Sequence, residues 1–237
     1  MSTAEPLVLL PGMGCTAALW AGLDLPDAPV TPVLEEDALD AEVDRLLRVL
    51  PERFALAGLS LGAVVAMALV RRAPQRVTRL ALLSTNPCAP TSAQRSGWAD
   101  QRAQLAAGSA RALQTSLLPL LLAPAVLASR PDVVATTLAM ADAVGTAGYD
   151  RQLRLQGTRV DERAGLARVR CPTLVLAACD DRLCGLDRHE EIASLVPRVR
   201  LAVVEDCGHL SPLEQPAAVS GHLRAWLTAD VLAPAAR

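Results

Sequence analysis

The feature that most constrains the fold of this 237-residue chain is an alternation of short apolar runs with longer segments of helical periodicity. The apolar runs are residues 7–10, 54–58, 79–83, 173–178 and 199–204. Apolar residues recur at three- and four-residue spacing over residues 39–50, 61–73, 187–196 and 213–228. This alternation predicts an α/β fold with a mostly parallel sheet flanked by helices. Ligands of such sheets bind at the carboxyl ends of the strands, so we expect the functional residues there.

The alternation stops after Asn86 and resumes at about Arg168, and the intervening residues have the composition of Ala- and Leu-rich helices. Breaks in these helices are expected at Pro87, Pro90, Pro119, Pro124, Pro131, Gly145 and Gly148. We interpret residues 87–168 as a helical cap inserted into a core made of residues 1–86 and 169–237. Within the cap, the apolar residues 117–122 would either line an acyl pocket or bury the cap against the core.

Composition and charge exclude several classes of function. With 51% hydrophobic and 20% charged residues the chain can form a large core, and a net charge of −2 gives no general attraction to nucleic acid or anionic lipid. Aromatic residues make up only 2%, so a site built on aromatic stacking is not expected. The longest apolar stretch, residues 117–128, is too short to span a membrane. Residues 1–6 lack the basic region of a secretory signal, so we expect a cytoplasmic protein.

The six cysteines are dispersed, without CxxC pairs, and are interpreted as free thiols. Four of them lie near the expected site loops: Cys15, Cys179, Cys184 and Cys207. Zinc binding is the alternative, but the spacing of these cysteines is not that of a structural zinc site. We therefore expect no metal and no cofactor.

Positive charge is concentrated in residues 151–170, which contain six arginines and two acids, a net charge of +4. Such a stretch could steer an anionic substrate, for example a carboxylate or an acyl carrier protein. It could equally be a solvated helix face.

The segment Gly58-Leu59-Ser60-Leu61-Gly62 joins an apolar run to a helical pattern. Glycine on both sides of Ser60 is typical of a tight, strained turn that exposes a nucleophilic serine. The amides that follow would lie at a helix N-terminus and could stabilise an oxyanion. An ordinary strand-to-helix turn is the alternative interpretation.

A serine nucleophile needs a base, and the chain has three histidines. His189 and His222 lie in helical patterns, whereas His209 follows the last apolar run and would share the sheet edge with Ser60. A carboxylate to orient this base could come from Asp180 or Asp181, which both follow residues 173–178. The chain order is therefore Ser, Asp, His.

Together these motifs resemble the α/β-hydrolase fold superfamily over most of the chain. The matching segments are Leu-Leu-Pro-Gly-Met-Gly at 9–14, the Ser60 turn, Pro-Thr-Leu-Val-Leu-Ala-Ala-Cys-Asp-Asp at 172–181 and Gly-His-Leu-Ser-Pro-Leu-Glu-Gln-Pro at 208–216. The family's spacing from the strand end favours Asp181 over Asp180. The resemblance also implies that the backbone amides of Met13 and Leu61 form the oxyanion hole.

The resemblance and the residues together predict a serine hydrolase of small or medium carboxylic esters or thioesters, either free small molecules or carrier-linked ones. Ser60 would be the nucleophile, His209 the base and Asp181 the carboxylate that orients it. One alternative uses the same triad for lactone, C–C bond or lyase chemistry in a biosynthetic pathway. The other is a binding protein with a catalytically silent triad.

Overall fold

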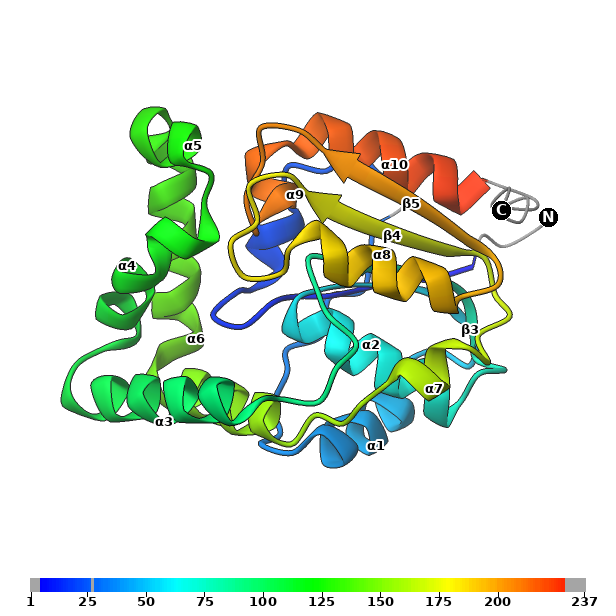
Figure 1. Cartoon of the computed structure of the whole chain (residues 1–237), viewed down its shortest axis with the longest axis horizontal. Coiled ribbons are helices and arrows are strands. Elements are labelled where there is room, and N and C mark those ends of the chain that lie inside the picture. The colour runs from blue at the N-terminus through cyan, green and yellow to red at the C-terminus, as the bar shows by residue number, and fades with distance from the viewer. Residues whose placement is uncertain (1–4, 27, 229–237) are drawn as a thin grey trace.

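A computed structural model describes residues 5–26 and 28–228 of the chain (Figure 1). The predicted N-terminal segment 1–6 and the predicted core range 169–237 extend into residues 1–4 and 229–237, which lie outside the described residues. Five parallel strands form one sheet in the order β1-β2-β3-β4-β5. They are β1 (Leu7–Leu10), β2 (Phe54–Leu59), β3 (Val77–Leu83), β4 (Thr173–Ala178) and β5 (Val199–Val204). The predicted α/β class with a parallel sheet is confirmed.

Alternate residues of the strands enter two separate cores because successive side chains of a strand point to opposite faces. Leu56 and Leu82 belong to the core on one face, whereas Leu9, Leu83 and Leu176 belong to the core on the other. Every residue of β1, β2 and β4 is buried, as expected for parallel strands covered on both sides.

Helices cover both faces of the sheet (Figure 1). The first face packs against α1 (Leu39–Val49), α2 (Leu61–Arg72), α7 (Arg163–Leu166) and α8 (Leu186–Leu195). The second packs against the short 3-10 helix η1 (Ala17–Trp20), α9 (Ser211–Glu214) and α10 (Pro216–Thr228). The predicted single helix over residues 213–228 is wrong: Pro216 disfavours a helical conformation for Gln215, and the segment divides there into α9 and α10.

The chain between β3 and β4 forms a helical segment, defined here as α3 to α6. Its helices are α3 (Ser92–Ala107), α4 (Ala110–Leu121), α5 (Pro124–Ser129) and α6 (Pro131–Gly157). Figure 1 shows α4, α5 and α6 beside the carboxyl ends of β4 and β5. Of the predicted breaks, Pro124 and Pro131 begin helices and Gly145 interrupts α6 with a φ of 69°. Pro119 and Gly148 lie inside helices, so the breaks predicted there are wrong.

Candidate active site

Ser60 lies in the turn between β2 and α2 at the carboxyl edge of the sheet. Its φ is 54°, a left-handed conformation that is strained for a residue other than glycine. The glycines around it are required by close packing: a Cβ on Gly58 would lie 2.4 Å from the carbonyl oxygen of Gly62, and one on Gly62 would lie 2.1 Å from that of Leu10. The predicted tight turn is therefore present, and it places Ser60 in a cavity.

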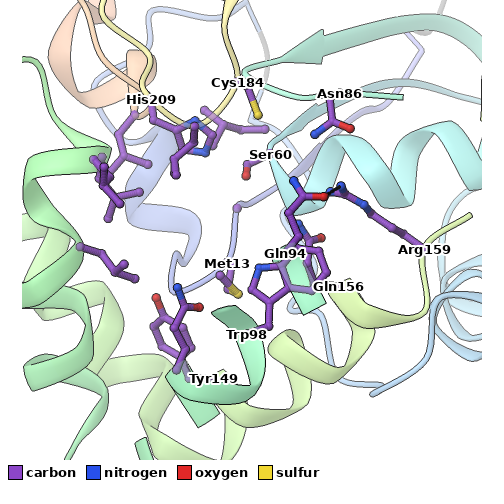
Figure 2. A pocket seen from close by; sticks show the side chains of 18 residues that line it. Met13, Ser60, Asn86, Gln94, Trp98, Tyr149, Gln156, Arg159, Cys184 and His209 are labelled. Carbon is purple, nitrogen blue, oxygen red and sulfur yellow. Dashed lines mark hydrogen bonds between the residues drawn. The ribbon is translucent and has the colours of Figure 1, made fainter. Parts of the chain in front are cut away.

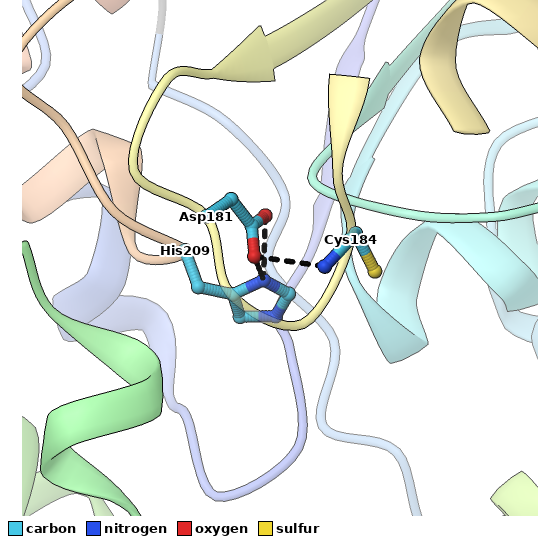
Figure 3. A group of neighbouring side chains, drawn as sticks. All are labelled: Asp181, Cys184 and His209. Atoms are coloured by element: carbon cyan, nitrogen blue, oxygen red, sulfur yellow. Dashed lines mark hydrogen bonds and ion pairs between the residues drawn. The ribbon is translucent and has the colours of Figure 1, made fainter. Parts of the chain in front are cut away.

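Asp181 and His209 form a buried pair in the loops that follow β4 and β5 (Figure 3). The Nδ1 atom of His209 lies 3.0 and 2.9 Å from the two carboxylate oxygens of Asp181. Oδ1 of Asp181 also accepts hydrogen bonds from the amides of Leu183 and Cys184, both at 2.9 Å. Burial acts to raise the pKa of Asp181, but attraction to His209 and these hydrogen bonds outweigh it, so the pKa lies below its ordinary value.

Asp180, the sequence alternative to Asp181, is exposed. Its backbone amide donates to the carbonyl of Cys207, and no hydrogen bond joins its side chain to His209. The structure thus places Asp181, rather than its neighbour, against the imidazole. The bond from Nδ1 to a carboxylate leaves Nε2 of His209 facing away from Asp181, as a base acting on a serine requires.

Ser60 and His209 line the same cavity, although no hydrogen bond joins their side chains within the described residues. The cavity has a volume of about 190 Å³. Leucines form one part of its wall: Leu117, Leu120, Leu121, Leu183 and Leu210. Polar and aromatic side chains form the rest of it, mainly Asn86, Gln94, Trp98, Gln101, Tyr149, Gln156 and Arg159 (Figure 2).

Asp181, Cys184 and His209 also have the composition of a metal site, since their ligand atoms lie within 4.8 Å of one another. Their chemistry fits a metal poorly. Burial raises the pKa of the Cys184 thiol to about 12, so it is not a thiolate at neutral pH. Both oxygens of Asp181 and Nδ1 of His209 are already hydrogen-bonded to each other. All six cysteines are free thiols, as predicted.

The other two histidines lie on helices, as predicted. His189 in α8 is fully buried, where its Nδ1 contacts the carbonyl of Gly185 and its Nε2 accepts from the amide of Thr85. Burial lowers its pKa. It is therefore a neutral structural group that ties α8 to the end of β3.

A family model described as the alpha/beta hydrolase family matches residues 7–221 of the chain. The chain belongs to this family. A pimeloyl-[acyl-carrier protein] methyl ester esterase of Aromatoleum aromaticum is 31% identical to this α/β hydrolase, over 89% of the chain and 93% of the relative. Relatives of this kind are ester hydrolases, and the chain is accordingly an enzyme of the carboxylic ester hydrolase type.

Solved structures show the same fold. A thermophilic esterase from Thermogutta terrifontis superposes with a TM-score of 0.81 at 23% identity, covering 95% of this chain and 90% of the esterase. An enol-lactonase from Burkholderia xenovorans superposes with a TM-score of 0.80 at 20% identity, covering 96% and 93%. One fold thus serves different reactions, so the substrate must be argued from the site itself.

Glu214 is a residue of the site that sequence reasoning missed. It is 3% exposed and accepts hydrogen bonds from the amides of Ala123, Gly208 and Leu210, at 2.8, 3.0 and 3.1 Å. The amide of His209 itself donates to the carbonyl of Leu121 at 3.0 Å. The junction of α4 and α5 therefore holds the His209 loop. The only sequence signal was an acidic residue five positions after His209.

The cavity of this α/β hydrolase bears on three other expectations. Residues 117–122 both line the cavity, through Leu117 and Leu120, and contribute to the core, through Leu118 and Leu122. Trp98 and Tyr149 line the cavity, whereas the low aromatic content had led us to expect no site built on aromatic stacking. Among the six arginines of residues 151–170, Arg154 and Arg163 form exposed ion pairs, but Arg159 is buried in the cavity wall.

No helix of the described residues is long and apolar enough to cross a membrane.

Proposed function

We propose that this α/β hydrolase is a serine esterase that cleaves a small or medium carboxylic ester through an acyl-enzyme on Ser60. The observation that carries the proposal is the buried Asp181–His209 pair, whose imidazole lines the same cavity as a serine held at a φ of 54°. The Aromatoleum relative is a methyl ester esterase, which supports ester hydrolysis. Helices α3 to α6 would act as the cap predicted over residues 87–168.

In the proposed mechanism, the Oγ atom of Ser60 attacks the carbonyl carbon while its proton passes to Nε2 of His209. Asp181 accepts the hydrogen bond from Nδ1 and stabilises the imidazolium that forms. The tetrahedral intermediate collapses, the bond to the leaving oxygen breaks, and His209 returns the proton to the departing alcohol. Water, activated by His209, then attacks the acyl-enzyme and releases the acid and free Ser60.

The amides of Met13 and Leu61 would stabilise the oxyanion. Leu61 is the first residue of α2, where helix amides lack partners within the helix. In the described part of the chain, neither amide donates a hydrogen bond. Loss of one such donor generally lowers the rate about 100- to 1,000-fold.

The proposal is tested by labelling with a fluorophosphonate probe and mapping of the modified peptide. We expect labelling at Ser60, none in Ser60→Ala, and labelling at least about 100-fold slower in His209→Ala because the base is lost. Ser129→Ala serves as the control, because Ser129 is an exposed serine of α5 whose hydroxyl only contacts the carbonyl of Ala125. A folded native protein that neither reacts with the probe nor hydrolyses 4-nitrophenyl acetate would instead support the silent binding protein.

A further inference from the structure

Arg159 is a buried cation that has no anionic partner among the residues that the structure describes. Arg159 lies two residues after the end of α6. It lines the cavity and is 5% exposed. Its Nη2 atom donates to the neutral amide oxygen of Gln94 at 3.1 Å, and its Nε has no hydrogen-bond partner within the described residues. Its guanidinium carbon lies 5.3 Å from the centre of the Trp98 ring, a cation–π contact that offsets only part of the desolvation.

The other buried charged groups of this protein are compensated. Glu42 pairs with Arg45 at 2.5 Å and Glu162 with Arg71 at 2.8 Å. Asp181 is held by His209 and two amides, and Glu214 by three amides. Burial lowers the pKa of Arg159. The other groups that act on this pKa are the thiols of Cys184 and Cys88 and the cation of Arg95. No carboxylate is among them. A guanidinium remains charged even so.

An unpaired buried charge reduces stability unless something else compensates it. Arg159 lies in the wall of the reaction cavity, where a ligand can supply the missing anion. Figure 2 shows Gln94, Trp98, Gln156 and Arg159 gathered on one side of the cavity.

The position of this group relative to Ser60 indicates which part of an ester it meets. In Figure 2, His209 and Arg159 lie on opposite sides of Ser60. The leaving alcohol must lie near His209, because that residue returns its proton to it. The acyl group therefore extends toward Arg159.

We propose that Arg159 binds a carboxylate at the far end of the substrate's acyl group, so that the preferred substrates are half-esters of dicarboxylic acids. This inference rests on the proposed esterase function. A planar guanidinium is well suited to a carboxylate because it offers several N–H donors in fixed directions. The leucines that line the cavity would then contact the methylene groups and the alcohol.

The test compares monomethyl esters of the four- to eight-carbon dicarboxylic acids with neutral analogues in which a methyl ketone replaces the carboxylate, such as methyl 6-oxoheptanoate for methyl hydrogen adipate. At one chain length or more, we expect kcat/KM of the native enzyme to favour the acid by about 10- to 100-fold, the usual range for a charged hydrogen bond. Arg159→Gln should bring the ratio of kcat/KM for the acid to kcat/KM for the neutral ester close to one, and Arg159→Lys should restore part of this preference. Arg154→Gln, which removes an exposed arginine of the same stretch, should retain the preference in full.

A binding measurement separates recognition from catalysis. The non-hydrolysable ketone 6-oxoheptanoate should raise the Tm of native protein and of Ser60→Ala, but not that of Arg159→Gln. Without ligand, Arg159→Gln should be at least as thermostable as native protein, because an uncompensated charge has been removed. A lower Tm would show that Arg159 is structural and would overturn the proposal.

The outcomes distinguish this inference from the proposed function. If 4-nitrophenyl acetate is hydrolysed in a Ser60-dependent way but acids and ketones are cleaved alike at every chain length, the esterase stands and the role of Arg159 is refuted. A preference for a carboxylate in the alcohol part, tested with 4-acetoxybutanoate against 5-acetoxy-2-pentanone, would also refute the acyl-side assignment. Absence of any Ser60-dependent hydrolysis would refute the esterase itself.

Discussion

Asp181 shows how one carboxylate is kept ionised inside a protein. It is only 7% exposed, yet it receives two amide hydrogen bonds in addition to the contact with Nδ1 of His209. These interactions hold its pKa below the ordinary value in spite of burial. A carboxylate of this kind orients an imidazole and stabilises its charged form, but takes no proton itself.

Asp181→Asn is expected to lower kcat by about 1,000- to 10,000-fold, the range for loss of the correct histidine tautomer. The asparagine amide group would face Nδ1 of His209 as a donor and favour the tautomer that carries its proton on Nε2. Steady-state kinetics with 4-nitrophenyl acetate measure the loss, and circular dichroism checks the fold. Asp180→Asn is the matched control, and activity equal to that of native protein is expected for it. A loss of less than 10-fold in Asp181→Asn would contradict the role of this carboxylate.

The residues of the site differed in how readily the sequence revealed them. Ser60 and His209 stand in local motifs, next to glycines that the turns require, so short-range pattern was enough to select them. Asp181 could be separated from Asp180 only by family spacing. Arg159 and Glu214 could not be singled out, because what distinguishes them is burial and partners supplied by distant segments, such as Trp98 and Ala123.

At the scale of elements, the strands were predicted to within two residues of their ends, because a strand buried on both faces is a continuous apolar run. Helix ends near proline were less predictable. Pro119 remains inside α4, two residues before its end, although it removes one amide donor from the helix. The packing of α3 to α6 against the sheet depends on long-range contacts and left no periodic signal in the sequence.

Glu214, the last residue of α9, binds two other parts of the chain: the loop before α9, which carries His209, and the α4–α5 junction. Glu214→Ala is expected to lower the free energy of unfolding by roughly 3 kcal/mol or more, because three buried amides lose their acceptor. The value of kcat should also fall, because the His209 loop loses its anchor. Glu214→Gln retains an acceptor oxygen and should restore part of both quantities.

Urea denaturation and esterase kinetics measure the two effects of Glu214→Ala. The neighbouring Gln215→Ala provides the control, since the side-chain amide of Gln215 makes only an exposed hydrogen bond to the carbonyl of Asp206. If kcat of Glu214→Ala equals that of native protein, Glu214 supports the fold alone and does not position His209.

At the scale of the whole molecule, the helical segment must be held in one place over the sheet edge, because it supplies a large part of the cavity wall. The chain just before α3 and the chain after α6 are joined by a hydrogen bond, in which the amide of Glu162 donates to the carbonyl of Pro87 at 2.8 Å. Arg71, at the end of α2, pairs with the Glu162 carboxylate, which is 2% exposed. This ion pair links the chain that follows α6 to helix α2 of the core.

Arg71→Met is expected to lower the free energy of unfolding at pH 7 by at least about 2 kcal/mol, because it leaves the Glu162 carboxylate buried and unpaired. Burial already raises the pKa of Glu162, with Arg71 opposing the shift, so the variant should have a still higher value. A carboxyl whose folded-state pKa is raised takes up a proton more readily when folded, so stability should rise as pH falls from neutral toward the unfolded-state pKa. Urea denaturation at pH 7 and pH 5 should therefore show a smaller loss of unfolding free energy at pH 5.

Two control variants test the cause. Arg71→Met combined with Glu162→Gln should recover most of the unfolding free energy lost at pH 7. Arg102→Met, which breaks an exposed pair with Asp150, should lower the unfolding free energy little at either pH. A deficit in Arg71→Met that is equal at the two pH values would show that lost packing, rather than an unpaired carboxylate, is responsible.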